Sequence, residues 1–257
     1  MCHDDCPHPV SGGDAISELE TSIQVTDREM PAFVALPDQR PAPSVLIIHD
    51  INGANAFYHD VARRLALAGY IAVLPDFFHR QGALTDDSRE SKQARMRSMS
   101  QSVTISDIES ALIWTRHLGE GNGKVGTLGF CMGGTLVLLA ASRDPLPDAT
   151  VAFYGFPFRE RTPTAPILPG DEGEVATLRS PLLAFWGTED AGVGMDNVDR
   201  YESLLDQYDR DYEFVRYEGV GHGFLTFDEQ SPDWPAAQDA WDHSLGFFGE
   251  HLATGAS

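Results

Sequence analysis

The residue with the clearest chemical potential is Cys131, which stands at the centre of a Gly-x-Cys-x-Gly pattern between the apolar runs 125–128 and 135–141. The two runs predict a buried strand and a buried helix joined by a sharp turn. Such a turn needs small residues two positions before and after its apex, here Gly129 and Gly133, because strand and helix approach closely there. The helix N-terminus also favours a thiolate at the apex. The pattern predicts a nucleophile at Cys131; the alternative is a buried cysteine beside a packing turn.

A candidate acid and a candidate base follow two later strands of the sequence. Asp190 comes directly after the apolar run 182–186, and His222 follows the run 212–217. In open α/β sheets, functional groups gather at the carboxyl ends of the strands. His222 would accept the thiol proton or pair with the thiolate, and Asp190 would orient the imidazole. Glu189 is the alternative acid. The order nucleophile, acid, base is typical of α/β hydrolases.

An acyl-transfer site also needs two donors for the oxyanion of the tetrahedral intermediate. The first expected donor is the backbone N–H of Met132, which directly follows the nucleophile, and the second is the N–H of Ile51 in the loop after the strand 44–49.

The elements that must position these groups alternate between strands and helices. Strands are expected at 44–49, 71–76, 125–128, 150–154, 182–186 and 212–217, helices at 57–68, 105–118, 197–208 and 236–252, and a hairpin at 22–36. The polar stretch 81–102 reads as a solvated helix or a flap, and 159–174 as an excursion loop. This alternation predicts an α/β class protein with a mostly parallel, doubly wound sheet flanked by helices. Together with the order of the candidate nucleophile, acid and base, it predicts the α/β-hydrolase fold. We expect a single domain over residues 16–257 after a loose arm over residues 1–15.

The arm contains four residues of metal-ligating type, Cys2, His3, Cys6 and His8, but their spacing matches no zinc pattern. We interpret the arm as inert. Adventitious metal binding and a redox-sensitive cysteine pair are the alternatives.

Composition limits the partners and the compartment. The net charge of −21 argues against nucleic acid and anionic membranes, since both need a basic surface. No run approaches the roughly 20 apolar residues of a membrane span, and the first residues lack the basic and apolar regions of a secretory signal. Three cysteines in 257 residues do not make a disulfide framework. We expect a cytoplasmic protein.

Five segments together resemble the dienelactone hydrolase (carboxymethylenebutenolidase) family, and the resemblance extends over residues 32–252. They are 48–55 (Ile-His-Asp-Ile-Asn-Gly-Ala-Asn), 75–81 (Pro-Asp-Phe-Phe-His-Arg-Gln), 129–134 (Gly-Phe-Cys-Met-Gly-Gly), 187–190 (Gly-Thr-Glu-Asp) and 221–224 (Gly-His-Gly-Phe). The resemblance implies hydrolysis of a lactone or related ester through an acyl-cysteine intermediate, without a metal or organic cofactor. Cys131, Asp190 and His222 match the family's triad.

The resemblance also implies roles for residues outside the triad. Asp50 stands where the family has a Glu that interacts with the thiol and switches its ionisation, and Arg80 matches one of two arginines that hold a substrate carboxylate. The second arginine position is Thr226, so recognition of a carboxylate should be weaker and less directional. For Arg80 the alternative is a surface salt bridge. We interpret His49 and His79 as packing or loop-ordering residues.

Two questions stay open at this level. Five aromatic residues at strand ends or in nearby loops either line an apolar pocket or belong to the core: Phe57, Phe77, Phe78, Tyr154 and Phe156. The triad fixes acyl transfer but not the acyl group, so a general carboxylesterase or a thioesterase is the alternative function. A weakly active relative that binds a ligand or senses redox state is the third. A small-molecule lactone or ester is the expected partner, of a monomer or a homodimer.

Overall fold

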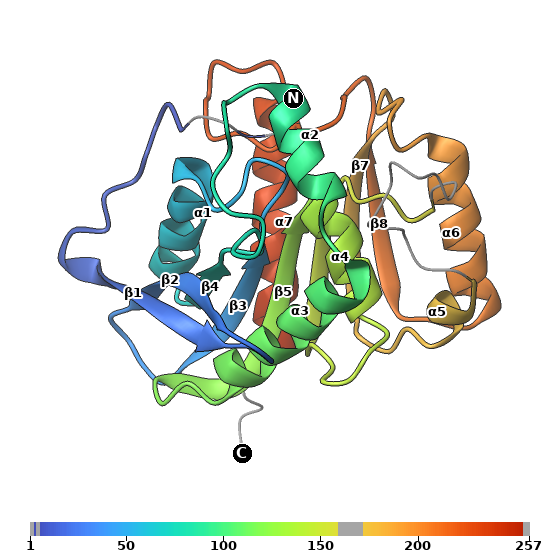
Figure 1. Cartoon of the computed structure of the whole chain (residues 1–257). Helices are drawn as coiled ribbons and strands as arrows, with labels where there is room; N and C mark the ends of the chain where they lie inside the picture. The colour runs from blue at the N-terminus through green and yellow to red at the C-terminus, as the bar shows by residue number, and fades with distance from the viewer. Residues whose placement is uncertain (1–2, 4–5, 159–171, 254–257) are drawn as a thin grey trace.

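The structure is a computed structural model that describes residue 3 and residues 6–158 and 172–253. In this part of the chain the strands form one eight-stranded sheet with the order β1-β2-β4-β3-β5-β6-β7-β8 (Figure 1). The strands are β1 (Ile16–Gln24), β2 (Glu29–Pro37), β3 (Ala42–Ile48), β4 (Ile71–Pro75), β5 (Gly121–Phe130), β6 (Ala149–Phe153), β7 (Leu182–Gly187) and β8 (Tyr212–Tyr217). β2 pairs antiparallel with β1 and β4, and all other pairs are parallel. The carboxyl ends of the parallel strands therefore lie along one edge of the sheet.

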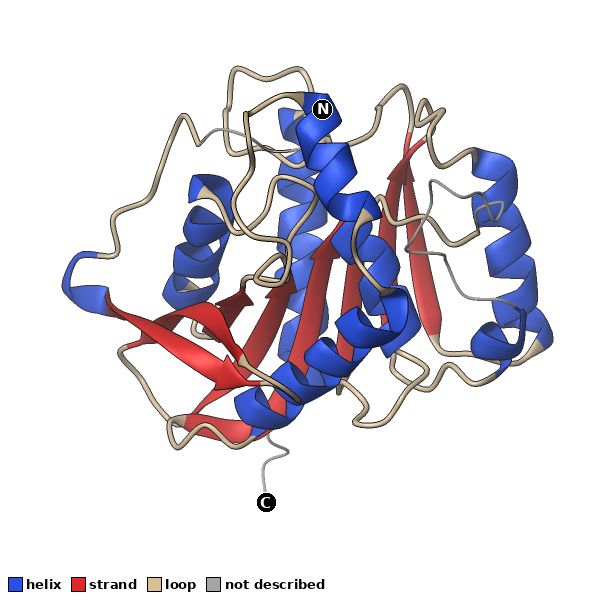
Figure 2. Ribbon diagram, viewed as in Figure 1, coloured by secondary structure: helices blue, strands red, loops and turns tan. Residues whose placement is uncertain are grey.

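Helices cover both faces of this sheet (Figure 2). They are α1 (Ala56–Leu67), α2 (Arg89–Arg97), α3 (Gln101–Arg116), α4 (Met132–Ala140), α5 (Glu172–Ala176), α6 (Met195–Gln207) and α7 (Trp234–Leu252), with a 3-10 turn at Gly13–Ala15. α1 and α7 lie on one face, and α3 and α4 on the other. Every residue of β4, β6 and β7 is buried, as expected of parallel strands covered on both sides. β1 is mostly exposed, because it forms the edge of the sheet.

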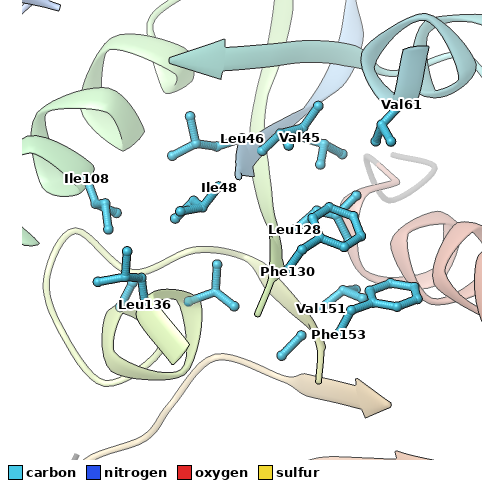
Figure 3. Close-up of a cluster of buried hydrophobic side chains, with 14 of the residues drawn as sticks. Val45, Leu46, Ile48, Val61, Ile108, Leu128, Phe130, Leu136, Val151 and Phe153 are labelled. Atoms are coloured by element: carbon cyan, nitrogen blue, oxygen red, sulfur yellow. The ribbon is translucent and has the colours of Figure 1, made fainter. Parts of the chain in front are cut away.

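The core lies where β3, β5 and β6 contact α1, α3 and α4 (Figure 3). The side chains labelled there are all fully buried: Val45, Leu46, Ile48, Val61, Ile108, Leu128, Phe130, Leu136, Val151 and Phe153. Burial of a side chain of this size stabilises the fold by roughly 1.5–3 kcal/mol. These three strands are neighbours in the middle of the sheet, and Cys131 directly follows β5.

The predicted fold class is confirmed, and the predicted strands and helices all occur near their expected bounds. The hairpin is longer than expected, since β1 begins at Ile16. The polar stretch 81–102 contains the solvated helix α2. The expected excursion loop lies largely outside the described residues, and its last part is the short helix α5.

Part of the segment predicted as a loose arm is bound to the domain. The N–H of Val10 donates to Asp60 Oδ1 at 2.6 Å, and Arg64 Nη2 donates to the carbonyl oxygen of His8 at 3.0 Å. Burial and the nearby carboxylate of Asp60 raise the pKa of Cys6 to about 11, so its thiol stays protonated at neutral pH. Cys2 lies outside the described residues, which leaves the alternative of a redox-sensitive cysteine pair untested.

Candidate active site

The turn at Cys131 has the backbone conformation that the glycine spacing predicts. Cys131 has φ 53° and ψ −110°, a strained combination for a residue with a side chain. A Cβ on Gly129 would lie 2.2 Å from the carbonyl oxygen of Gly133, and a Cβ on Gly133 would lie 1.9 Å from the carbonyl oxygen of Ile48. Neither position has room for a side chain, so both glycines are required for β5 and α4 to meet at this angle.

The turn also brings the N-terminus of α4 against the end of β3. The site for a Cβ on Gly133 is blocked by the backbone of Ile48 and His49, the residues just before the loop that contains Ile51. Met132 is the first residue of α4, where backbone N–H groups have no partner within the helix. The two segments expected to supply oxyanion donors are therefore neighbours.

The candidate acid and base form a short hydrogen bond at the ends of β7 and β8. His222 Nδ1 lies 2.6 Å from Asp190 Oδ2. Asp190 is buried, and its other oxygen accepts the N–H groups of Gly192 at 3.0 Å and Val193 at 3.1 Å. Glu189, the alternative acid, is exposed. With Nδ1 held by a carboxylate, Nε2 is the nitrogen of His222 that can exchange a proton with a substrate or thiol.

The loop that carries His222 is fixed against the end of β7. The N–H of Glu189 donates to the carbonyl oxygen of Val220 at 2.9 Å, and a Cβ on Gly187 would lie 2.1 Å from that same oxygen. The imidazole of His222 also contacts the ring of Tyr154, with centroids 5.0 Å apart. Tyr154 follows β6, the strand between β5 and β7. The base therefore reaches back across the sheet toward the strand that ends at Cys131.

Asp50 is fully buried in the loop after β3. Its Oδ1 accepts the N–H of Asn52 at 2.7 Å, and its Oδ2 accepts Asn52 Nδ2 at 3.3 Å and the N–H of His3 at 3.0 Å. These three donors fix the direction in which the carboxylate of Asp50 points.

His49 supports the same loop in a neutral form. Its Nδ1 lies 2.8 Å from the carbonyl oxygen of Asp50, and its Nε2 accepts the N–H of Phe77 at 3.1 Å. One nitrogen must donate and the other accept, so only a neutral imidazole fits both contacts. Burial lowers the pKa of His49 accordingly. This agrees with its interpretation as a loop-ordering residue.

The structure places Arg80 between two carboxylates. Its Nε and Nη2 each donate to Asp107 at 2.8 Å, and its Nη1 lies 2.7 Å from Asp27 Oδ1. The bond to Asp107 raises the pKa of the guanidinium. His79 lies 3.7 Å from Asp107 Oδ2. At the second expected arginine position, the hydroxyl of Thr226 accepts the N–H of Asp228 at 3.1 Å.

Sequence reasoning missed two side chains near the loop after β3. His3 is buried among residues that follow β3 and β6 and contacts Tyr154 and Phe57. Arg95 of α2 donates to the carbonyl oxygen of Ile51 at 3.1 Å and stacks on Phe78 at 3.9 Å. No local pattern could have found either one, because their partners are distant in the chain. Phe57, Phe77 and Phe78, together with Tyr154, are themselves buried.

Among the described residues, no cluster of three or more histidine, cysteine, aspartate or glutamate side chains is arranged to hold a metal ion. In the same part of the chain, no helix is both long and apolar enough to cross a membrane.

The sheet order and the sharp turn from β5 to α4 define an α/β hydrolase. More narrowly, the chain belongs to the dienelactone hydrolase family, which it matches over residues 30–252. It is 31% identical over 259 residues to a carboxymethylenebutenolidase of Rhodococcus opacus, covering 100% of both chains. It is 31% identical over 212 residues to a Bradyrhizobium protein assigned as a 2-oxo-3-(5-oxofuran-2-ylidene)propanoate lactonase, covering 82% of this chain and 84% of that one.

A solved structure agrees with these relatives. A Klebsiella pneumoniae protein assigned as a dienelactone hydrolase superposes with a TM-score of 0.83 at 28% identity, over 92% of this chain and 99% of that one. The resemblance inferred from the sequence is confirmed. The protein is a carboxylic-ester hydrolase that acts on a lactone or ester bond of a small molecule.

Proposed function

We propose that the protein hydrolyses a lactone or small ester through an acyl-cysteine intermediate, with Cys131 as nucleophile, His222 as base and Asp190 as the acid that orients it. One observation carries this proposal. The apex of the strained turn is a cysteine, and a His222–Asp190 pair 2.6 Å apart lies at the ends of β7 and β8, along the same edge of the sheet. A strained backbone at a residue of nucleophilic type favours a functional role over a packing role.

The proposed reaction has two acyl-transfer steps. Sγ of Cys131 attacks the carbonyl carbon while its proton passes to Nε2 of His222, and the oxyanion is bound by the N–H groups of Met132 and Ile51. Collapse breaks the ester C–O bond, and the leaving oxygen takes the proton from His222. Water then gives a proton to His222 and attacks the thioester. Collapse of the second intermediate releases the carboxylic acid and restores the thiol.

Asp50 is proposed as the carboxylate that controls ionisation of the thiol. It is buried in the loop next to the N-terminus of α4, and a negative charge there opposes formation of a second one on Cys131. Asp50→Asn should therefore lower the pH at which Cys131 reaches half its maximal alkylation rate. An unchanged or higher pH would contradict this role.

Arg80 is proposed to bind a carboxylate on the substrate by exchanging partners. Its bidentate bond to the buried Asp107 is held firmly, whereas Asp27 is 50% exposed and can leave Nη1 to a substrate. Arg80→Ala should raise KM for a carboxylate-bearing lactone and leave a neutral ester unaffected. Asp27→Asn should lower the same KM. Equal changes on both substrates would indicate a structural role for Arg80 instead.

The substrate class follows from the relatives and from the charge of the protein. The Rhodococcus opacus and Bradyrhizobium relatives carry the names of a carboxymethylenebutenolidase and a lactonase, which favours a lactone. Thr226 in place of a second arginine and the net charge of −21 favour a less anionic substrate than dienelactone. A general carboxylesterase is the second candidate for that reason. We also infer a reducing compartment, the cytoplasm, because a thiol nucleophile must stay reduced.

The test is steady-state hydrolysis of para-nitrophenyl acetate and of a carboxylate-bearing lactone by the wild type, Cys131→Ala and His222→Ala. Each variant should lose turnover of both substrates while its circular dichroism spectrum stays that of the wild type. Glu189→Gln, which changes an exposed carboxylate beside the acid, is the matched control and should retain activity. Turnover at the wild-type rate by Cys131→Ala would contradict the proposal.

A further inference from the structure

His3 crosses the end of the strand that carries the proposed nucleophile. Its carbonyl oxygen accepts Asn52 Nδ2 at 2.8 Å and Asn55 Nδ2 at 2.6 Å, and its N–H donates to Asp50. All three partners follow β3. On the other side, His3 Nε2 lies 2.6 Å from the hydroxyl of Tyr154, which follows β6.

The sheet order decides what lies beneath these contacts. β5 is the strand between β3 and β6. A residue bonded to the ends of both flanking strands must pass over the end of β5, where Phe130 precedes Cys131. The ring of His3 lies 6.4 Å from that of Phe130, centroid to centroid, in agreement with this placement.

The imidazole of His3 is closely packed against the domain. Its imidazole stacks on Phe57 with centroids 3.9 Å apart and an interplanar angle of 7°, and the residue is 9% exposed. Burial lowers the pKa of His3 to about 3, so the ring is neutral at physiological pH and packs as an aromatic group. His8, in the same arm, has a side chain that is 57% exposed.

The side of Cys131 on which His3 lies indicates the part of the substrate that it would meet. In the proposed mechanism the leaving oxygen takes its proton from His222, which comes from the loop after β8 and is bound to the end of β7. The leaving group must therefore face that side. The oxyanion faces the loop after β3, which contains Ile51. His3 is bonded both to that loop and to Tyr154, so it lies over the end of β5 between the two, in the direction that is left for the acyl group.

We propose that His3 forms a wall of the acyl pocket and limits the size of the acyl group that the enzyme accepts. This inference rests on the function proposed above, because it assigns the acyl side from the direction of attack. The substrate class it favours is a lactone or ester with a compact acyl portion. Phe57 and Tyr154 hold the wall in place, the first by stacking and the second by its hydroxyl.

The experiment compares kcat/KM for para-nitrophenyl hexanoate with kcat/KM for para-nitrophenyl acetate, a quotient called here the acyl-length ratio. His3→Ala should raise this ratio by about tenfold or more, because space for even one methylene changes discrimination on that scale. The matched control is His8→Ala, which removes the same side chain from an exposed position of the same arm and should leave the ratio at the wild-type value. An unchanged ratio in His3→Ala would overturn the proposal. This includes an equal rise of kcat/KM for both esters, which would mean that His3 covers the site without selecting the acyl group.

A second measurement does not depend on turnover. The rate of alkylation of Cys131 is followed by peptide mass spectrometry with iodoacetamide and with the bulky reagent fluorescein maleimide. His3→Ala should accelerate the maleimide reaction more than the iodoacetamide reaction. Equal acceleration of both reactions would contradict the proposal that His3 limits the space at Cys131. If Cys131→Ala hydrolyses the acetate normally, the proposed function fails, whereas the alkylation rates still report whether His3 restricts access to the thiol.

Discussion

The turn at Cys131 and the arm at His3 meet at the same edge of the sheet, but different forces hold them. The turn is fixed by backbone packed on backbone, with Gly129 and Gly133 leaving no room for a Cβ. The arm is fixed by hydrogen bonds and one stacked ring, and its partners lie 47 to 151 residues away in the chain. Closely packed backbone cannot shift by a fraction of an ångström without losing contacts, whereas hydrogen bonds can be removed one at a time. Substitutions at the turn should therefore not be tolerated, whereas substitutions in the arm should change the shape of the pocket.

The largest effect is expected at the acid. Asp190→Asn should lower kcat by about ten-thousandfold, because an amide at this position favours the wrong tautomer of His222. The acyl-length ratio should stay at the wild-type value, since the wall at His3 is untouched. Steady-state kinetics of the acetate and hexanoate esters measure both quantities. Glu189→Gln is the control. An equal loss of kcat in that variant would contradict the assignment of Asp190 as the acid.

The next effect concerns the rigidity of the turn. Gly133→Ala should lower the free energy of unfolding by about 3 kcal/mol, because the new Cβ would lie 1.9 Å from the carbonyl oxygen of Ile48. Urea unfolding followed by circular dichroism measures the change. Gly119, in the exposed turn after α3, has no atom within 4 Å of a Cβ, so Gly119→Ala should change stability little. Equal stability of the two variants would contradict a rigid turn.

A smaller effect is expected from the loop between the two regions. Burial lowers the pKa of His49 below its ordinary value of 6.5, so the unfolded chain binds more protons than the folded one below about pH 6.5. The free energy of unfolding should therefore fall as the pH drops from about 6.5, by about 1 kcal/mol per pH unit from this residue. Urea unfolding at several pH values should show a shallower fall for His49→Gln. An equally steep fall in the variant would contradict the neutral contacts assigned to His49.

The smallest effect tests whether the arm is adjustable. Asn55 caps α1 with its side-chain oxygen, which accepts the N–H groups of Phe57 and Tyr58, and donates to His3 with its nitrogen. Asn55→Asp keeps the cap and removes the donor, so it should weaken the arm without unfolding α1. Because Asn52 still binds the same oxygen, the acyl-length ratio should rise by about fivefold at most. An unchanged ratio would mean that the arm is held elsewhere.

The same contrast explains what the sequence could predict. The turn at Cys131 follows from residue types two positions apart, since a close approach of strand and helix admits only glycine there. The hydrogen-bonded positions of Asp190 and His222 follow from the rule that parallel strands end at a common edge. Both inferences need only local patterns and the sheet class.

The rest depends on contacts that no local pattern constrains. The sequence left Arg80 open between a salt bridge and a substrate anchor, and the structure pairs it with Asp107 and Asp27, which come from α3 and the β1–β2 turn. His3 belongs to a segment without periodicity and was interpreted as part of an inert arm, because burial of a single polar side chain against distant strands leaves no trace in its neighbours.

The most direct test of the account is to trap the acyl-enzyme. The wild type is mixed with an excess of para-nitrophenyl acetate, quenched in acid during steady state and analysed by intact mass and peptide mapping. The account predicts one added acetyl group on the peptide that contains Cys131, and none on that peptide in Cys131→Ala. An acyl group on a different residue that forms and decays at the rate of turnover would contradict the central claim that Cys131 is the nucleophile.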